Sequence, residues 1–189
     1  MILTVAQVAA AARAPLDAVA VNWPLLAAAL AEVGDATGPA EVALAATVAV
    51  ETAYTFRPVA ERWPRGQTAE QYFARYAPPH PVAQALGNRS VEDAVRYRGR
   101  GFLQITGRAN YARYGARLGL DLLATPEQAL DAGVSARVAA AYGHDHAIPA
   151  LAARGDWRGV RRAVNGGLNG DAEFEAIVGL LVTHLPTAA

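Results

Sequence analysis

The sequence contains neither cysteine nor lysine among its 189 residues. Without cysteine there is no disulfide framework, no thiolate metal site and no cysteine nucleophile. All 17 basic residues are arginines, and 17 acidic residues balance them, so the net charge of zero argues against a nucleic-acid-binding protein. No apolar run reaches the roughly 18 residues of a membrane-spanning helix, and we expect no membrane insertion.

The N-terminal stretch, residues 1–12, is apolar, but no basic residues precede its apolar run. It therefore lacks the form of a secretory signal. Thr4 and Gln7 have the spacing of a capping box, which predicts that a helix begins there. We expect a soluble protein that accumulates in the cytoplasm.

Helix signals recur along the chain, whereas strand signals are few. The length favours one domain spanning residues 1–189, and abundant alanine favours helix. We predict a mainly α fold of about eight helices besides shorter turns. Caps, prolines and glycines predict helix starts near Thr4, Pro24, Thr37, Thr68, Ser90, Gly107, Thr125, Ser135, Asp156 and Asp171. Residues 102–105 are the best strand candidate.

Residues 97–111, here called the central segment, have the most unusual composition. They combine three glycines, three arginines, a glutamine, a threonine and an asparagine around a short apolar stretch. Glycines let a backbone approach a ligand closely, and the polar groups supply directed hydrogen bonds. The composition predicts a wall of a binding cleft, with Tyr97 and Arg100 among the candidate contacts.

Six arginines and no acidic residue lie within residues 94–120: Arg96, Arg98, Arg100, Arg108, Arg113 and Arg117. Such a cluster could bind phosphate, nucleic acid or another anionic polymer. Its members could equally pair with the chain's own acids. We expect them to support the fold and the site carboxylates rather than to bind nucleic acid.

Glu51 is the first candidate for acid–base chemistry. On the helix that opens at Thr37, Leu44, Thr47, Val48 and Glu51 fall at i, i+3, i+4 and i+7, so the carboxyl group shares a face with apolar residues. Apolar surroundings favour the protonated form that a general acid needs. The alternative is that Glu51 lies at a frayed helix end and turns to water.

Glu61 is the candidate for a second carboxylate. Pro58 prevents a continuous helix after Glu51, so the chain must turn and could bring Glu61 back across a cleft. Paired carboxylates are the apparatus of glycoside hydrolysis. Two alternatives stay open: Glu61 is a surface group that pairs with a nearby arginine, or Asp93 takes the second role.

Residues 165–170 form a second cleft-like stretch, with two Asn–Gly pairs in six residues. The glycines allow positive φ and close approach, and Asn165 offers an amide. The alternative is an ordinary helix-ending turn. His144 and His146 could suggest a metal, but side chains at i and i+2 of a helix diverge. We predict no metal site.

With these residues in view, the central segment resembles the signature of glycoside hydrolase family 19, in its phage-endolysin and bacterial lysozyme-like form. The likeness runs through residues 97–107 and on to Asn110 and Tyr111. Further similar stretches follow the family's order: Glu51 with Thr52 before residues 56–58, Glu61, residues 118–123 with Pro126, and residues 155–157 leading into 164–170. Together they cover about residues 40–185.

The resemblance implies a lysozyme-like, two-lobed fold with a substrate cleft and no metal or cofactor. It implies hydrolysis of a β-1,4 bond next to an N-acetylated sugar, with inversion at the anomeric carbon. Glu51 would be the general acid, Glu61 the base that activates water, and Thr106 the hydroxyl that positions this water. The implied sugar-subsite residues are Gln104, Asn110, Tyr111 and Asn165.

The sequence favours a monomeric endolysin that degrades bacterial peptidoglycan and lyses the cell. It would stay in the host cytoplasm until release to the cell wall, in keeping with the missing signal. One alternative is a chitinase that acts on chitin oligosaccharides. Another is a catalytically silent glycan-binding module, because Val50 replaces the family's usual histidine and Tyr54 stands where a small residue is usual.

Overall fold

A computed structural model describes residues 1–186 of the chain, which form two compact units. Unit 1 combines Met1–Arg57 with the C-terminal part from Ala136, and unit 2 is Pro58–Ser135. In the sequence, unit 2 is thus inserted between the two parts of unit 1, within the stretch that we expect to be one domain. Helices predominate, which confirms the predicted mainly α class.

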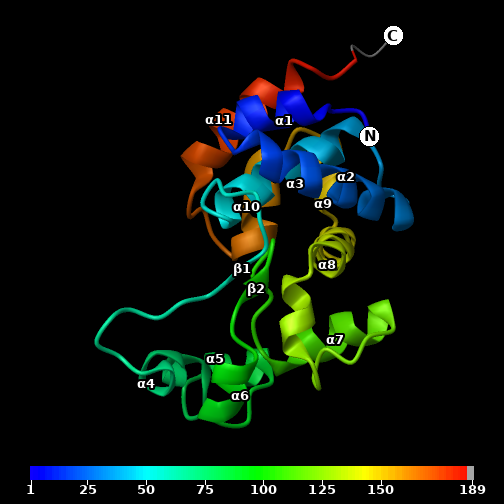
Figure 1. The fold of residues 1–189 in the computed structure, drawn as a ribbon. Helices are drawn as coiled ribbons and strands as arrows, with labels where there is room; N and C mark the ends of the chain where they lie inside the picture. The colour runs from blue at the N-terminus through cyan, green and yellow to red at the C-terminus, as the bar shows by residue number, and fades with distance from the viewer. Residues whose placement is uncertain (187–189) are drawn as a thin grey trace. The chain divides into compact units, whose positions relative to one another are not determined.

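Unit 1 is built around one central helix. Its helices are α1 (Val5–Ala12), α2 (Leu16–Glu32), α3 (Gly38–Glu51), α9 (Ile148–Ala153), α10 (Trp157–Asn165), α11 (Asp171–Val182) and the greater part of α8 (Ala132–Asp145). Helix α3 packs against α1, α2, α9, α10 and α11 (Figure 1). Every residue from 40 to 49 is buried, mostly alanine and valine, whose small side chains let neighbouring helices approach closely.

The start of α3 is determined locally and then anchored by a distant segment. Thr37 caps it through its hydroxyl, which accepts a hydrogen bond from the Ala40 amide at 3.3 Å, as predicted. Glu41 is almost completely buried. Its carboxylate accepts hydrogen bonds from the amides of Ile2 at 2.8 Å and Leu3 at 2.7 Å, so a buried charge ties the N-terminal segment to α3.

The predicted helix start at Pro24 is wrong. Helix α2 begins eight residues earlier, at Leu16, and Pro24 lies inside it. Proline removes a backbone hydrogen bond and crowds the preceding turn. The flanking side chains Trp23 and Leu26 are fully buried, and we attribute the persistence of the helix to the packing of this face.

Unit 2 has short elements. These are β1 (Val59–Ala60), α4 (Ala69–Phe73), 3-10 helix η1 (Ala74–Tyr76), α5 (Val82–Leu86), α6 (Val91–Arg96), β2 (Arg100–Gly101), α7 (Arg108–Leu118) and 3-10 helix η2 (Pro126–Leu130). The strands β1 and β2 pair antiparallel, with Val59 opposite Gly101. Phe73, Ala77 and Ala94 form a small buried core between α4 and α6.

Residues 102–105, the predicted strand, form a tight turn after β2. Arg100 and Ile105 exchange two backbone hydrogen bonds, at 3.3 and 3.0 Å, and so close the loop. Positive φ angles at Gly101 (94°) and Gln104 (52°) allow this reversal. The apolar residues that suggested a strand are instead the buried Phe102 and Ile105 of the turn.

The predicted helix ends are confirmed in most places. Thr4 and Thr68 form capping boxes, and Gly119 ends α7 in a left-handed conformation. Eleven α-helices occur in residues 1–186, more than expected, because several are single turns. The helix predicted at Thr125 is the 3-10 helix η2, and α11 has Gly170 rather than Asp171 at its cap.

In the part of the chain that the structure describes, no single helix is long and apolar enough to cross a membrane. One bent pair, α1 with α2, meets the length and composition criteria when the two helices are taken together.

Candidate active site

Glu51 is the last residue of α3, and its carboxylate is paired with Arg161 of α10. Arg161 Nη1 donates to Glu51 Oε1 at 2.7 Å, and the two side chains are only 2% and 16% exposed. Glu51 therefore neither faces a purely apolar surface nor turns to water, the two alternatives that the sequence offered. A charge-assisted hydrogen bond from a buried guanidinium fixes its orientation.

The loop of residues 165–170 packs over this pair. Arg161 Nε donates to the Asn169 carbonyl at 2.8 Å, and Asn165 Nδ2 donates to the same carbonyl at 3.2 Å. A Cβ on Gly170 would lie 3.0 Å from Val50 and 3.1 Å from Arg161 Nη2, so glycine permits the close approach. The structure thus brings the exposed Asn165 beside the partner of Glu51.

Tyr142 of α8 is a further neighbour of Glu51. Burial, and then the negative charge of Glu51, raise the pKa of Tyr142. The phenol therefore keeps its proton at neutral pH and donates to the Ala163 carbonyl at 2.9 Å.

Glu61 is held by groups of unit 2. Its Oε1 accepts hydrogen bonds from Arg75 Nη2 at 3.1 Å and from the Tyr76 hydroxyl at 3.2 Å, and its Oε2 accepts one from the Gly99 amide at 3.3 Å. The Glu61 amide donates to the Gly99 carbonyl at 2.8 Å. Glu61 thus pairs with an arginine, but this partner lies 14 residues further along the chain and is not a close sequence neighbour.

Aromatic rings position the arginine partner of Glu61. The Arg75 guanidinium carbon lies 3.7 Å from the centre of the Tyr72 ring and 4.9 Å from that of Tyr76, which are cation–π distances. Burial, and then the charge of Glu61, raise the pKa of Tyr76, so its hydroxyl remains a donor. Nothing in the sequence singled out Arg75 or Tyr76.

Three oxygen atoms converge at Gly99. A Cβ placed on this glycine would lie 2.9 Å from Gln104 Oε1, 3.2 Å from Glu61 Oε2 and 3.2 Å from Thr106 Oγ1. The Thr106 hydroxyl donates to the Gln104 carbonyl at 3.0 Å. The structure therefore gathers a carboxylate, an amide oxygen and a hydroxyl, three groups singled out from the sequence, around the one residue type that has no side chain.

Two predicted sugar contacts stay accessible in unit 2. Gln104 Nε2 donates to the carbonyls of Val59 at 2.5 Å and Gly101 at 3.0 Å, which fixes the amide on the β1–β2 hairpin. Asn110 Nδ2 donates to the Thr106 carbonyl at 2.8 Å. Both side chains are half-buried, so each can still meet a ligand.

The other predicted sugar contacts of the central segment require correction. Tyr97, Arg100 and Tyr111 are 5%, 2% and 0% exposed, and a buried side chain cannot contact a ligand. The Tyr111 hydroxyl donates to the Arg98 carbonyl at 2.8 Å and accepts from Arg100 Nη1 at 2.9 Å. These residues support the central segment from inside unit 2.

Three arginines of residues 94–120, Arg96, Arg98 and Arg100, donate to backbone carbonyls. Arg96 Nη2 donates to the carbonyls of Leu123 at 3.0 Å and Ala124 at 2.6 Å. Arg98 donates to the carbonyl of Val95 at 3.1 Å. They support the fold as expected, but the arginines that hold Glu51 and Glu61 come from outside this cluster.

Asp93, the alternative second carboxylate, is already engaged. Its Oδ2 accepts hydrogen bonds from the Arg89 amide and Nε, both at 3.0 Å, and lies 3.9 Å from Arg108 Nε. Burial acts to raise its pKa, but the hydrogen bonds from Arg89 and the charges of both arginines outweigh burial and lower it. These contacts are those of a structural ion pair.

Among residues 1–186, no cluster of three or more side chains has the composition of a metal site. His144 Nδ1 lies 2.9 Å from Asp35 Oδ2, and the His146 ring stacks on Tyr142 at 3.9 Å. The two imidazoles thus have separate partners.

Comparison with known proteins identifies a relative of part of the chain. No protein-family model matches it. A glycosyl hydrolase family 19 domain-containing protein of Haemophilus influenzae is 38% identical over 105 residues, 53% of this chain and 50% of that protein. The chain thus matches about half the length of this relative.

The fold is similar to that of a bacterial family 19 chitinase, whose reported structure revealed differences from the plant enzymes. The TM-score is 0.67 at 20% identity, over 96% of this chain and 95% of the other. At this identity the likeness concerns the fold. Sequence and fold therefore both support the resemblance of this chain to the chitinase- and lysozyme-like glycoside hydrolase family 19.

Proposed function

We propose that this protein hydrolyses the β-1,4 glycosidic bonds of bacterial peptidoglycan with inversion at the anomeric carbon. The observation that carries the proposal is the convergence of Glu61, Gln104 and Thr106 at Gly99. These are the positions to which the family resemblance assigns water activation, sugar binding and water positioning.

In the proposed reaction Glu51 is the general acid. Its proton passes to the oxygen of the leaving sugar as the glycosidic bond breaks, and the salt bridge to Arg161 then stabilises the carboxylate that remains. Because Arg161 is buried and bonded to the loop of residues 165–170, Glu51 starts from a defined orientation.

Glu61 is the proposed base. It removes a proton from water while the oxygen of that water attacks the anomeric carbon from the face opposite the leaving group, which inverts the configuration. Arg75, Tyr76 and the Gly99 amide hold the carboxylate, and the role that we propose for the neighbouring Thr106 hydroxyl is to orient the same water. Two carboxylates suffice for this chemistry, and neither a metal nor a cofactor takes part in the proposed steps.

Chitin is the second candidate substrate, because the solved structure with the similar fold is described as a chitinase. Both polymers present β-1,4-linked N-acetylated sugars. We further propose that the protein works as a monomeric endolysin that reaches the cell wall after release from the host cytoplasm. A catalytically silent glycan-binding module is the third possibility, and the experiment must distinguish it from the two hydrolases.

The decisive experiment compares wild type with Glu51→Gln and Glu61→Gln on purified cell walls and on soluble chitin oligomers. General acid or base catalysis contributes roughly 10²–10⁴-fold, so each variant should lose at least about a hundredfold in rate. Glutamine can still accept the hydrogen bond from Arg161, and unchanged melting curves should show that the fold persists. Glu175→Gln, an exposed change on α11, is the matched control.

The products decide between the candidates. A higher rate of bond cleavage on cell walls, followed as loss of turbidity, than on chitin oligomers favours peptidoglycan. A higher rate on chitin oligomers favours chitin. NMR of fresh product should show the inverted anomer, and a retained anomer would contradict the mechanism. Wild type that binds walls without releasing sugar would identify the silent module.

A further inference from the structure

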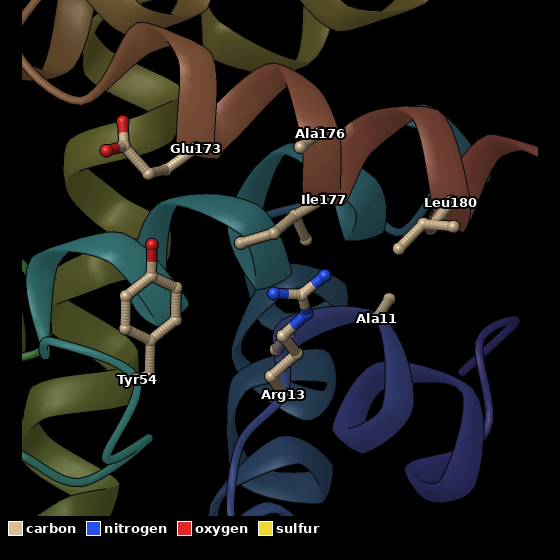
Figure 2. A pocket seen from close by; sticks show the side chains of 8 residues that line it. Ala11, Arg13, Tyr54, Glu173, Ala176, Ile177 and Leu180 are labelled. Atoms are coloured by element: carbon tan, nitrogen blue, oxygen red, sulfur yellow. The ribbon is translucent and has the colours of Figure 1, made fainter.

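Unit 1 contains a pocket of about 390 Å³ beside the helix that carries Glu51. Its floor consists of Ala11 of α1 and of Ala176, Ile177 and Leu180 of α11 (Figure 2). The volume lies within the roughly 300–1,000 Å³ range of small-ligand sites. Leu180 is 51% exposed, so an apolar surface is left open at one end of the pocket.

Three polar side chains surround this apolar floor: Arg13, Tyr54 and Glu173. In Figure 2 the Tyr54 hydroxyl points toward the end of α11 that carries Glu173, and the Arg13 guanidinium points toward Ile177. Neither Arg13 nor Glu173 has an ion-pair partner within residues 1–186. The pocket therefore presents one cation, one anion and one neutral hydroxyl over a floor suited to methyl groups.

The backbone that positions two of these side chains is unusual. Arg13 and Tyr54 have φ angles of 50° and 63°, a region that residues other than glycine rarely adopt. The Tyr54 amide donates to the Ala49 carbonyl at 2.7 Å, and Asn22 Nδ2 donates to the Phe56 carbonyl at 2.9 Å, so the turn is held from both sides. Backbone conformations of this kind are concentrated at ligand sites and active sites.

The pocket is connected to the surroundings of Glu51 by short stretches of chain. Tyr54 follows Glu51 by three residues, which limits their Cα separation to about 11 Å. Glu173 follows Gly170 by three residues, and a Cβ on Gly170 would lie 3.1 Å from the Nη2 of Arg161, the partner of Glu51. A polymer held at Glu51 could therefore extend a side branch into the pocket.

We propose that this pocket binds a short peptide branch with small apolar side chains, a free carboxylate and an ammonium group. Arg13 pairs with the carboxylate, Glu173 with the ammonium group, and the alanine and isoleucine floor accepts methyl groups. This is the chemistry of the peptide stems of peptidoglycan, whereas chitin carries neither charge. The inference rests on the proposed function and adds a reason for preferring peptidoglycan to chitin.

The kinetic test compares intact peptidoglycan, the same glycan strands after removal of their peptides, and a chitin hexamer. Arg13→Gln and Glu173→Gln should each lower kcat/KM on intact peptidoglycan about three- to fivefold, the range of a solvent-exposed ion pair. Rates on the other two substrates should stay unchanged. Glu175→Gln, on the same helix but outside the pocket, and Arg154→Gln, another exposed arginine of unit 1, are the matched controls.

A binding measurement separates failure of this inference from failure of the proposed function. NMR titration with the tripeptide L-alanyl-γ-D-glutamyl-L-lysine should shift signals of α11 and of Tyr54, and less so in Arg13→Gln and Glu173→Gln. If the protein binds the tripeptide but cleaves no glycan, the peptide subsite is supported and the proposed hydrolase activity is contradicted. Cleavage without tripeptide binding, or an equal loss in the pocket variants on peptide-free strands, would overturn the peptide subsite.

Discussion

Gly99 shows how one residue can organise a site. It contributes no side chain, yet its amide and carbonyl both bond Glu61, and the side-chain oxygens of Gln104 and Thr106 lie around the position that a Cβ would occupy. A methyl group here would occupy the space in which these three oxygens converge. The neighbours can move only by giving up the geometry that we propose for water activation.

Gly99→Ala should therefore lower kcat with little effect on stability. A misplacement of about 1 Å can cost on the order of a hundredfold in rate, and we expect a loss of about 10- to 100-fold. Steady-state kinetics together with a thermal melt would measure both effects. Gly179→Ala, on α11 with nothing within 4 Å of the new Cβ, should leave the rate unchanged. Full activity of Gly99→Ala would argue against this water site.

The residues around Glu51 and Glu61 show what the sequence could and could not predict at this scale. Both glutamates were identified from helix phase, a proline and the family signature, which are local patterns. Arg75 lies 14 residues from its partner Glu61, and Arg161 lies 110 residues from Glu51. No periodicity joins positions so far apart, so these two arginines became visible only through packing.

At the scale of elements, local signals predicted most helix ends. Thr37 and the capping boxes at Thr4 and Thr68 satisfy amides of the same first turn, so three or four residues decide each start. Pro24 violates such a local rule inside α2. The helix continues because Trp23 and Leu26 are buried, and burial depends on the neighbouring helices rather than on the local sequence.

Pro24→Ala should stabilise the protein. Proline in a helix interior destabilises the folded state by about 3 kcal/mol relative to alanine. Proline also restricts the unfolded chain, which offsets up to about 1 kcal/mol of this cost. We therefore expect a gain of about 1–2 kcal/mol in the free energy of unfolding, measured with urea. Pro39→Ala, in the first turn of α3 where proline fits, is the control and should bring no gain. A loss on replacing Pro24 would mean that its ring packs favourably.

For the molecule as a whole, two units contribute separate halves of the proposed chemistry. Unit 1 holds Glu51, Arg161 and the asparagine loop, and unit 2 holds Glu61, Gln104 and Thr106. The central segment owes its conformation to the interior of unit 2, where Tyr97 and Tyr111 pack with ring centres 5.4 Å apart. Stability of unit 2 and the geometry of the proposed site therefore depend on the same segment.

Asp93 couples the stability of this protein to pH. Its pKa in the folded chain is lowered from the usual 3.8, so the unfolded chain binds more protons as pH falls through that region. The stabilisation that the Asp93 carboxylate gives to the folded state is present above about pH 4 and is lost as the pH falls further. Asp93→Asn should cost about 1–2 kcal/mol near neutral pH and much less near pH 3, by urea unfolding. An equal cost at both pH values would show that the ionic contacts with Arg89 and Arg108 contribute little.

The sequence by itself determined the helical class and most helix caps, because neighbouring residues encode them. Local patterns also made Glu51 and Glu61 candidates for the acid and the base, whereas the role of Thr106 is implied by the family resemblance. Only the tertiary structure decided which side chains hold them, and that Tyr97, Arg100 and Tyr111 face inward rather than toward a sugar. Burial and pairing are properties of segments that meet in space, so a local pattern of polar groups cannot distinguish a cleft wall from the interior that supports it.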